Sequence, residues 1–240
     1  MTKTMILGKD AALEDSIERM KAYLADIGFV VEEASWLNPV PHVWSLHLRD
    51  TYCPMLFTNG KGATKLACLA SALGEFLERL NCNYFFADFY LGDKIAQGPF
   101  VHYPQEKWFK LEGDAWPQGL FDKELKKLYD PTGELKASML IDTQSGNAER
   151  GVCALPFVRQ RDGKTIYIPM NIVGNLYVSN GMSAGNTPME ARVQSLSEIF
   201  ERAIKNKIIA EGISLPDVPA SVIANYPRIQ EAIKKLEDHG

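Results

Sequence analysis

The 240 residues are enough for one large α/β domain or for two smaller lobes. Hydrophobic residues make up 46% of the chain and charged residues 23%, which is typical of a globular protein and excludes an intrinsically disordered one. The net charge is −4 and the basic residues are scattered, so no direct nucleic-acid binding is expected. No apolar run approaches the roughly 20 residues of a membrane span, so no membrane association is expected either.

The cysteines and histidines give no sign of disulfides or of a zinc site. No two cysteines have CxxC spacing, and no histidine lies at metal-ligand spacing from another histidine or from a cysteine. The N-terminal segment has no apolar stretch long enough for a signal peptide. We therefore expect a reduced, cytoplasmic compartment. The residues concerned are Cys53, Cys68, Cys82, Cys153, His42, His47, His102 and His239.

The N-terminal part of the chain predicts a helix followed by strands. Apolar residues recur at helical spacing over residues 11–27, and Gly28 follows where a helix commonly ends. Residues 29–37 and 43–49 are rich in β-branched and aromatic side chains, and the proline-containing segment between them is typical of a turn. A third strand is expected to end at Phe57.

A glycine-rich segment then separates the strands from a long helix. Residues 58–62 break the strand pattern, and residues 63–83 have the length and small-residue content of a well-packed helix. Residues 92–151 contain several prolines and glycines and are interpreted as an insertion. This insertion is expected to contain a short lysine-rich helix near residues 122–129.

The C-terminal part repeats the order of strands, turn and helix. Residues 152–159 and 165–168 resemble strands around a polar turn, and residues 172–178 lead into the turn Ser179-Asn180-Gly181. A long helix is predicted over about residues 187–210.

A last helix is predicted over residues 227–237. Its end resembles the end of the first helix, which feeds a strand, but here the chain stops. We therefore expect the 240 residues to be a fragment of a longer protein.

One helical motif occurs twice. Both copies place a polar residue and then Glu-x2-Glu-Arg after an Asn-Gly turn. The offset is 121 residues at the turn (180 minus 59) and 123 at the first glutamate (198 minus 75), so a two-residue insertion is expected within the second copy. The match indicates an internally duplicated strand-turn-helix unit. Its residues are Ser71, Glu75, Glu78 and Arg79 in the first copy and Gln194, Glu198, Glu201 and Arg202 in the second.

The spacing of the motif places its polar residues on one helix face. Residues three and four positions apart share a face, so each helix presents its two glutamates together. If the two helices pack about a pseudo-twofold axis, four carboxylates converge, and their repulsion calls for a cation such as Mg²⁺. Carboxylate-bound Mg²⁺ in turn suits a polyphosphate, whose oxygens the motif arginines could meet. The alternative is a duplicated scaffold with a solvated acidic face.

Residues 180–186 form a small-residue turn before a helix, where backbone N–H groups favour anions. Familiar nucleotide and hydrolase signatures are absent, since the sequence contains no GxxxxGK[ST], complete GxGxxG, HExxH or GxSxG. A Rossmann or P-loop reading is therefore excluded.

The order Ser-x3-Glu-x2-Glu-Arg, then Ser-Asn-Gly-x-x-Ala-Gly and a second Glu-x2-Glu-Arg, resembles the YcaO family over essentially the whole chain. Residues 33–41 and 168–175 are similar to the free-standing bacterial type, an accessory factor of ribosomal-protein methylthiolation. The resemblance implies an ATP-binding α/β (α+β) fold without a Walker motif, in which mixed or antiparallel sheets pack against long helices. It implies ATP and Mg²⁺ as cofactors.

Carried over residue by residue, the resemblance makes Glu75, Glu78, Glu198 and Glu201 the Mg²⁺ ligands. It places further side chains near the nucleotide, namely Lys9, Ser16, Ser71, Arg79, Asn186, Gln194 and Arg202. Without it, Lys9 and Ser16 would be interpreted as a lysine at a helix N-terminus and an exposed helical serine.

The implied domain is the incomplete N-terminal part of a YcaO domain over residues 1–240. It divides into a first motif unit over about residues 1–90, an insertion over about 92–151 and a second motif unit over about 152–240. Because the family's fold is longer and its remaining ATP contacts lie further along, this fragment is expected to be inactive alone.

Two functions stay open from the resemblance. The favoured one is an ATP-binding accessory factor for the methylthiotransferase RimO, which adds a β-methylthio group to an aspartate of a small-subunit ribosomal protein. The other is an ATP-dependent enzyme, cyclodehydratase or thioamide-forming, that phosphorylates a backbone amide oxygen of a peptide. Family members commonly form homodimers, so a homodimer is expected.

Overall fold

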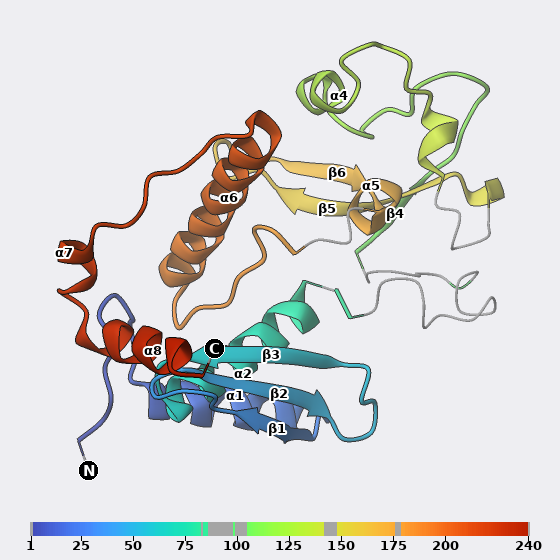
Figure 1. The fold of residues 1–240 in the computed structure, drawn as a ribbon. Coiled ribbons are helices and arrows are strands. Elements are labelled where there is room, and N and C mark those ends of the chain that lie inside the picture. The colour runs from blue at the N-terminus through green and yellow to red at the C-terminus, as the bar shows by residue number, and fades with distance from the viewer. Residues whose placement is uncertain are drawn as a thin grey trace. The chain divides into compact units, whose positions relative to one another are not determined.

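The computed structural model describes residues 2–82, 84–85, 98, 105–141, 148–175 and 179–239. The chain forms two compact units (Figure 1). The first unit comprises Met1–Cys82 and Ser179–Gly240, and the second comprises Asn83–Val178. Each unit has its own antiparallel sheet with helices beside it, so the predicted α/β fold with antiparallel sheets is confirmed.

The sheet of the first unit is a three-stranded antiparallel meander. It consists of β1 (Val31–Leu37), β2 (Trp44–Asp50) and β3 (Phe57–Gly62), with β2 in the centre. Every second residue of β2 is buried, Leu46 and Leu48 among them, which is the alternation of a strand with one covered face.

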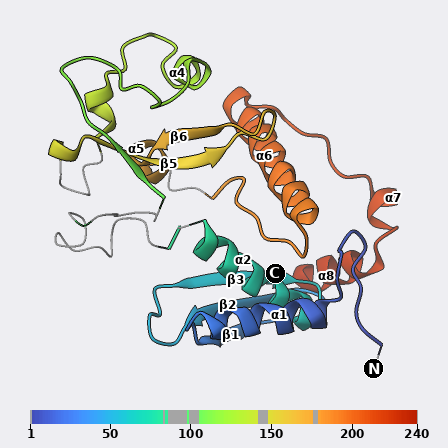
Figure 2. The same cartoon turned by 180° about the vertical axis from the view of Figure 1, so that it is seen from behind.

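The covered face of this sheet packs against α1 (Leu13–Asp26) and α2 (Lys65–Asn81), which lie together on one side of it (Figure 2). Both helices have one apolar stripe, and the buried side chains come from it. Phe76 of α2 is fully buried and makes an edge-to-face contact with Phe29 at a ring distance of 5.9 Å. The other large buried side chains are Leu24, Leu46, Leu48, Cys68 and Leu73.

The expectation that residues 58–62 form a turn is wrong, because they are strand β3 and pair with β2 in the register Leu46↔Gly60. The glycines there serve close packing. A Cβ on Gly60 would lie 2.2 Å from the carbonyl oxygen of Cys68, and one on Gly62 would lie 2.5 Å from its backbone nitrogen. The sequence resembles a turn because glycine is common both in turns and at strand positions where another backbone approaches closely.

The C-terminal part of the first unit begins with α6 (Pro188–Glu211). Thr187 is its N-cap, accepting a hydrogen bond from the amide of Glu190 at 3.2 Å, and Gly212 ends it in the left-handed conformation at φ +60°. Unlike α2, this helix has no buried residue. Two further helices follow, α7 (Ala220–Ile223) and α8 (Pro227–Glu237); α7 was not predicted.

The second unit is built on the sheet β4-β5-β6, in which every pair is antiparallel. Its elements are β4 (Lys107–Phe109), α4 (Lys123–Tyr129), η1 (Ala137–Leu140), η2 (Ala148–Arg150), β5 (Val152–Val158), β6 (Thr165–Pro169) and α5 (Met170–Asn175). A core forms around Phe109, Leu120, Leu140 and Val152.

The lysine-rich helix and the two strands predicted in this region are confirmed as α4, β5 and β6. The short strand β4 was missed, and residues 170–175 form a helix where only a lead into a turn was foreseen. The rest of that lead, residues 176–178, lies outside the described residues, as do parts of the predicted insertion. The division into two motif units and an insertion stays a prediction. None of the described helices has the length and apolar character needed to cross a bilayer.

Candidate functional site

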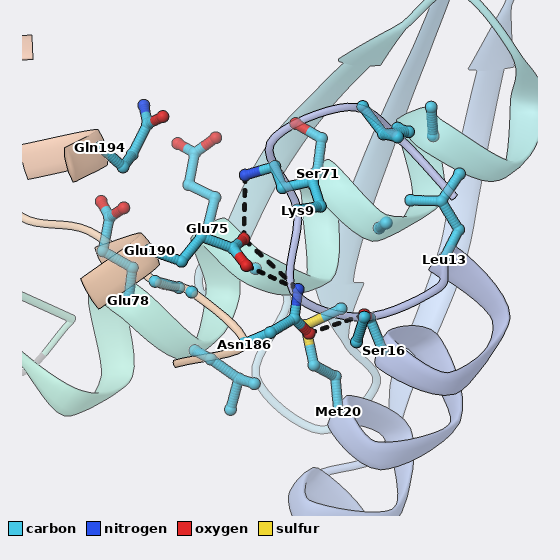
Figure 3. Close-up of a pocket in the computed structure, with 18 of the residues that line it drawn as sticks. Lys9, Leu13, Ser16, Met20, Ser71, Glu75, Glu78, Asn186, Glu190 and Gln194 are labelled. Carbon is cyan, nitrogen blue, oxygen red and sulfur yellow. Dashed lines mark hydrogen bonds and ion pairs between the residues drawn. The ribbon is translucent and has the colours of Figure 1, made fainter. Parts of the chain in front are cut away.

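A cavity of about 790 Å³ lies within the first unit, lined by α1, α2, the segment before α1 and the first turns of α6 (Figure 3). It brings together all the predicted site residues except Glu201. These are Lys9, Ser16, Ser71, Glu75, Glu78, Arg79, Asn186, Gln194, Glu198 and Arg202. Segments about 170 residues apart in the chain therefore meet at one place, as the hydrogen bond between Ser16 and Asn186 illustrates.

On α2, the two motif glutamates share one arginine. Arg79 lies 3.1 Å from Glu75 through Nη2 and 3.9 Å from Glu78 through Nε. Burial raises the pKa of Glu78 to about 7; Arg79 opposes this shift, and the negative charges of Glu75 and Glu198 add to it. One arginine thus does not fully compensate the carboxylates gathered here.

The side chains of α2 and α6 reach the cavity because each helix carries polar residues at four-residue spacing. On α2 these are Ser71 and Glu75, and on α6 they are Glu190, Gln194 and Glu198. In the view of Figure 3, the carboxylates of Glu75 and Glu78 and the amide of Gln194 extend to the same side of the cavity.

Glu190 of α6 accepts hydrogen bonds from Asn186 and from the segment before α1. Its carboxylate accepts from Lys9 at 2.9 Å, from the backbone amide of Asp10 at 3.2 Å and from the amide of Asn186 at 3.0 Å (Figure 3). Its side chain is 8% exposed. Burial alone would raise the pKa of Glu190, but the hydrogen bonds from Lys9, Asn186 and Asp10 hold it below its usual value.

The segment before α1 is fixed to the start of α6 by further polar contacts. Asn186 Oδ1 accepts from Ser16 Oγ and from Arg19 Nη2, both at 2.7 Å, and Thr187 Oγ1 donates to Asp10. The interpretation of Ser16 as an exposed helical serine is wrong, since it is buried and also donates to the carbonyl of Ala12 at 2.9 Å.

In the structure, the two copies of the motif align at one constant offset of 123 residues. The helix caps Thr64 and Thr187 are separated by 123 residues (187 minus 64), like the first glutamates. So are Gly62 and Gly185 (185 minus 62), whose added Cβ atoms would lie 2.5 Å and 2.4 Å from the backbone nitrogens of Cys68 and Ala191.

The Asn-Gly match at offset 121 is therefore not a structural equivalence. The first Asn-Gly lies inside β3, whereas the second forms a turn in which Met182 N donates to the carbonyl of Ser179 at 2.9 Å. No two-residue insertion is needed from Gly62 onward.

The repeat explains why sequence reasoning missed Glu190. At the offset of 123, its counterpart is Ala67 (190 minus 67), so a search for matched residues passes over it. Its spacing of four residues before Gln194 was the available signal. Conversely Glu201, the counterpart of Glu78 (201 minus 78), is exposed and does not line the cavity. The cavity thus combines the matched pair Glu75 and Glu198 with Glu78, whose counterpart lies outside it, and Glu190, whose counterpart is an alanine.

The helix N-terminus after residues 180–186 is occupied by the chain's own groups. Thr187 accepts from the amide of Glu190 through its side chain and from that of Ala191 through its carbonyl, and Pro188 has no N–H. The predicted anion site on these amides therefore has little donor capacity left.

The cavity offers carboxylates, which suit Mg²⁺, and guanidinium groups, which suit a polyphosphate. Within the described ranges, no three histidine, cysteine, aspartate or glutamate side chains lie close enough to hold a metal ion by themselves. Instead the motif arginines approach the glutamates, with Arg202 Nη2 at 3.8 Å from Glu198. The buried Nε of Arg202 has no hydrogen-bond partner among the residues described. Crowded carboxylates and an unsatisfied guanidinium fit a cation and an anion that bind together.

Comparison with known proteins identifies the pattern. A family model described as YcaO cyclodehydratase, binding ATP and Mg²⁺, matches residues 59–240. The Escherichia coli ribosomal protein S12 methylthiotransferase accessory factor YcaO is 68% identical over the whole chain, and an uncharacterized Haemophilus influenzae protein is 62% identical over 99% of it. The chain spans 41% of the length of either relative.

Among solved structures, YcaO from Methanopyrus kandleri bound with AMPPCP and Mg²⁺ matches 96% of this chain and 55% of its own, with a TM-score of 0.52. The sequences are 18% identical, so this likeness concerns the fold. It agrees with the fold that the duplicated motif predicts.

Proposed function

Because the chain belongs to the YcaO family, we propose that the cavity of the first unit binds ATP with Mg²⁺. Glu75, Glu78 and Glu198 are the proposed metal-binding carboxylates, and Glu201 stays a predicted fourth. Ser71, Asn186 and Arg202 are proposed to lie near the phosphates, and Lys9, Ser16, Arg79 and Gln194 complete the set of nucleotide contacts. When bound, the metal would neutralise phosphate charge and leave the terminal phosphoryl group open to transfer.

One observation carries this proposal: Glu75 and Glu198, although 123 residues apart (198 minus 75), line the same cavity as Glu78. Burial raises the pKa of Glu78 to about 7, and the negative charges of Glu75 and Glu198 add to this shift. Carboxylates that line one cavity repel one another, and a divalent cation relieves the repulsion. A solvated acidic face would leave such a glutamate at its ordinary pKa. The scaffold alternative is therefore the weaker explanation.

Calorimetry of the intact protein with Mg·ATP tests the site. We expect Glu75→Gln and Glu198→Gln each to weaken binding by about tenfold or more, because each removes a charged ligand from a metal and phosphate cluster. Glu32→Gln and Glu33→Gln are matched controls, since these glutamates of β1 pair with Arg49 of β2 and Lys21 of α1 and do not line the cavity. Equal effects at the four positions would place the nucleotide elsewhere.

The biological role that we favour is that of an accessory factor in β-methylthiolation. The relative that is 68% identical carries the name ribosomal protein S12 methylthiotransferase accessory factor. The proposed partners are RimO and a small-subunit ribosomal protein whose aspartate is modified. A homodimer and a cytoplasmic location remain predictions.

The second candidate is an enzyme that activates backbone amides, which the family description as a cyclodehydratase favours. Mass spectrometry separates the two roles. Cells lacking the gene should carry the small-subunit ribosomal protein without its β-methylthio group if the accessory role is right. Unchanged methylthiolation, with loss of an azoline or thioamide from another peptide, would favour the enzyme.

A further inference from the structure

The carboxylates and cations that line the cavity do not balance. Glu75 and Glu78 face Arg79, Glu190 faces Lys9, and Glu198 faces Arg202. Two more basic residues, Arg19 and Lys61, line the same cavity. In the part of the chain that the structure describes, neither has a carboxylate within ion-pair distance.

Arg19 is held at the cavity by a neutral partner. It lies on α1 one turn after Ser16, and its Nη2 donates to Asn186 Oδ1 at 2.7 Å. An amide oxygen orients the guanidinium without cancelling its charge. Arginine has five N–H donors in a planar fork, so most of them are available to a ligand.

Lys61 is the last residue but one of β3 and also lines the cavity. Its backbone amide donates to Ser71 Oγ at 3.4 Å. The strand approaches α2 so closely at Gly60 and Gly62 that neither glycine has room for a Cβ, and this fixes the backbone that carries Lys61. Its counterpart in the second copy is Ala184 (184 minus 61 is 123), which also lines the cavity, so the lysine is present on one side only.

We propose that Arg19 and Lys61 bind phosphate oxygens of the nucleotide and make the cavity selective for a polyphosphate. This inference rests on the proposed function. Mg·ATP keeps a net negative charge, which attracts two cations that have no carboxylate partner. Each cation also stands beside a serine, Ser16 or Ser71, that the resemblance places at the nucleotide.

The test is the affinity of the intact protein for Mg·ATP, Mg·ADP and adenosine, measured by calorimetry. Arg19→Gln and Lys61→Gln are each expected to weaken Mg·ATP binding by about tenfold and Mg·ADP binding by less, and to leave adenosine unchanged. Lys21→Gln on α1 and Lys65→Gln on α2 are controls, because both lysines are exposed and lie outside the cavity lining. Arg19→Lys should retain part of the Mg·ATP affinity.

Two outcomes would overturn the inference while leaving the proposed function intact. One is undiminished Mg·ATP affinity in both glutamine variants. The other is an equal loss for Mg·ATP and adenosine, which would indicate contact with the base or a change in the fold. A wild-type protein that does not bind Mg·ATP would instead overturn the proposed function itself.

Discussion

Helices α2 and α6 carry the same motif and the same type of cap, yet their surroundings differ. α2 buries Leu73 and Phe76 against the sheet, whereas α6 buries no residue. The apolar residues of α6 are exposed, namely Met189, Val193, Leu196, Ile199, Phe200, Ile204 and Ile209. What holds the start of α6 in place is polar, through Asn186, Thr187 and Glu190.

Within the described part of the first unit, the two copies share the polar face, whereas a covered apolar face is seen for α2 alone. The shared features, a close glycine, a threonine cap and a first glutamate, all set where the helix begins and which side faces the cavity. The apolar face of α2 packs against the sheet β1-β2-β3 of the same unit. Stability should therefore depend on α2, and the geometry of the site on both helices.

The largest difference in stability is expected between the variants Phe76→Ala in α2 and Phe200→Ala in α6. Phe76→Ala should lower the free energy of unfolding by about 3 to 5 kcal/mol, because it leaves a cavity in the core. Phe200 is 64% exposed, so Phe200→Ala should change it by less than about 0.5 kcal/mol. Urea denaturation of the chain described here measures both. A large loss at Phe200 would mean that α6 is packed in solution.

The next largest effects on stability are expected at the equivalent glycines, Gly62 and Gly185. Gly62→Ala and Gly185→Ala each bring a methyl group within about 2.5 Å of a backbone nitrogen, so each should lower the free energy of unfolding by about 1 to 3 kcal/mol. Gly74→Ala is the control, since space is open there and alanine favours a helix by about 0.5 to 1 kcal/mol. If Gly185→Ala were neutral, the close approach of the backbone to the helix would not be shared by the two copies.

Two glutamates of the cavity should respond to pH with opposite sign. The pKa of Glu78 is raised to about 7. Its favourable contribution to the free energy of unfolding is therefore present below the ordinary pKa of 4.5 and is lost as the pH rises through 7. Glu78→Gln should therefore stabilise the protein above pH 7, by about 1 to 2 kcal/mol after allowance for partial exposure.

The pKa of Glu190 is lowered, so its contribution is present above 4.5 and is lost as the pH falls through the folded-state pKa. Glu190→Gln should hence destabilise the protein at neutral pH and have less effect in acid. The measurement is the thermal unfolding of both variants from below pH 4.5 to above pH 7. The same sign of change in the two variants would contradict the assigned environments.

The sequence predicted the helices α1, α2, α4, α6 and α8 and the strands β1, β2, β5 and β6, because apolar periodicity and turn residues report local structure directly. The predicted motif residues except Glu201 line one cavity, since a repeated Glu-x2-Glu-Arg fixes a helix face. The prediction failed at residues 58–62, where glycines needed for close packing resemble a turn. Glu190, Arg19 and Lys61 were missed because their importance depends on segments that meet only in three dimensions.

The smallest effects on stability should come from substitution of the two helix N-caps, Thr64 and Thr187. These substitutions also test whether α2 and α6 begin independently of each other. Thr64→Ala removes the acceptor of the Ala67 amide, bonded at 3.1 Å, and should cost about 1 kcal/mol of unfolding free energy, while Thr64→Ser should cost less. Thr187→Ala also removes the contact with Asp10, so its cost should exceed that of Thr64→Ala. Since Asp10 is adjacent to Lys9, only Thr187→Ala should weaken Mg·ATP binding. A loss of affinity in Thr64→Ala would mean that the start of α2, too, positions the nucleotide.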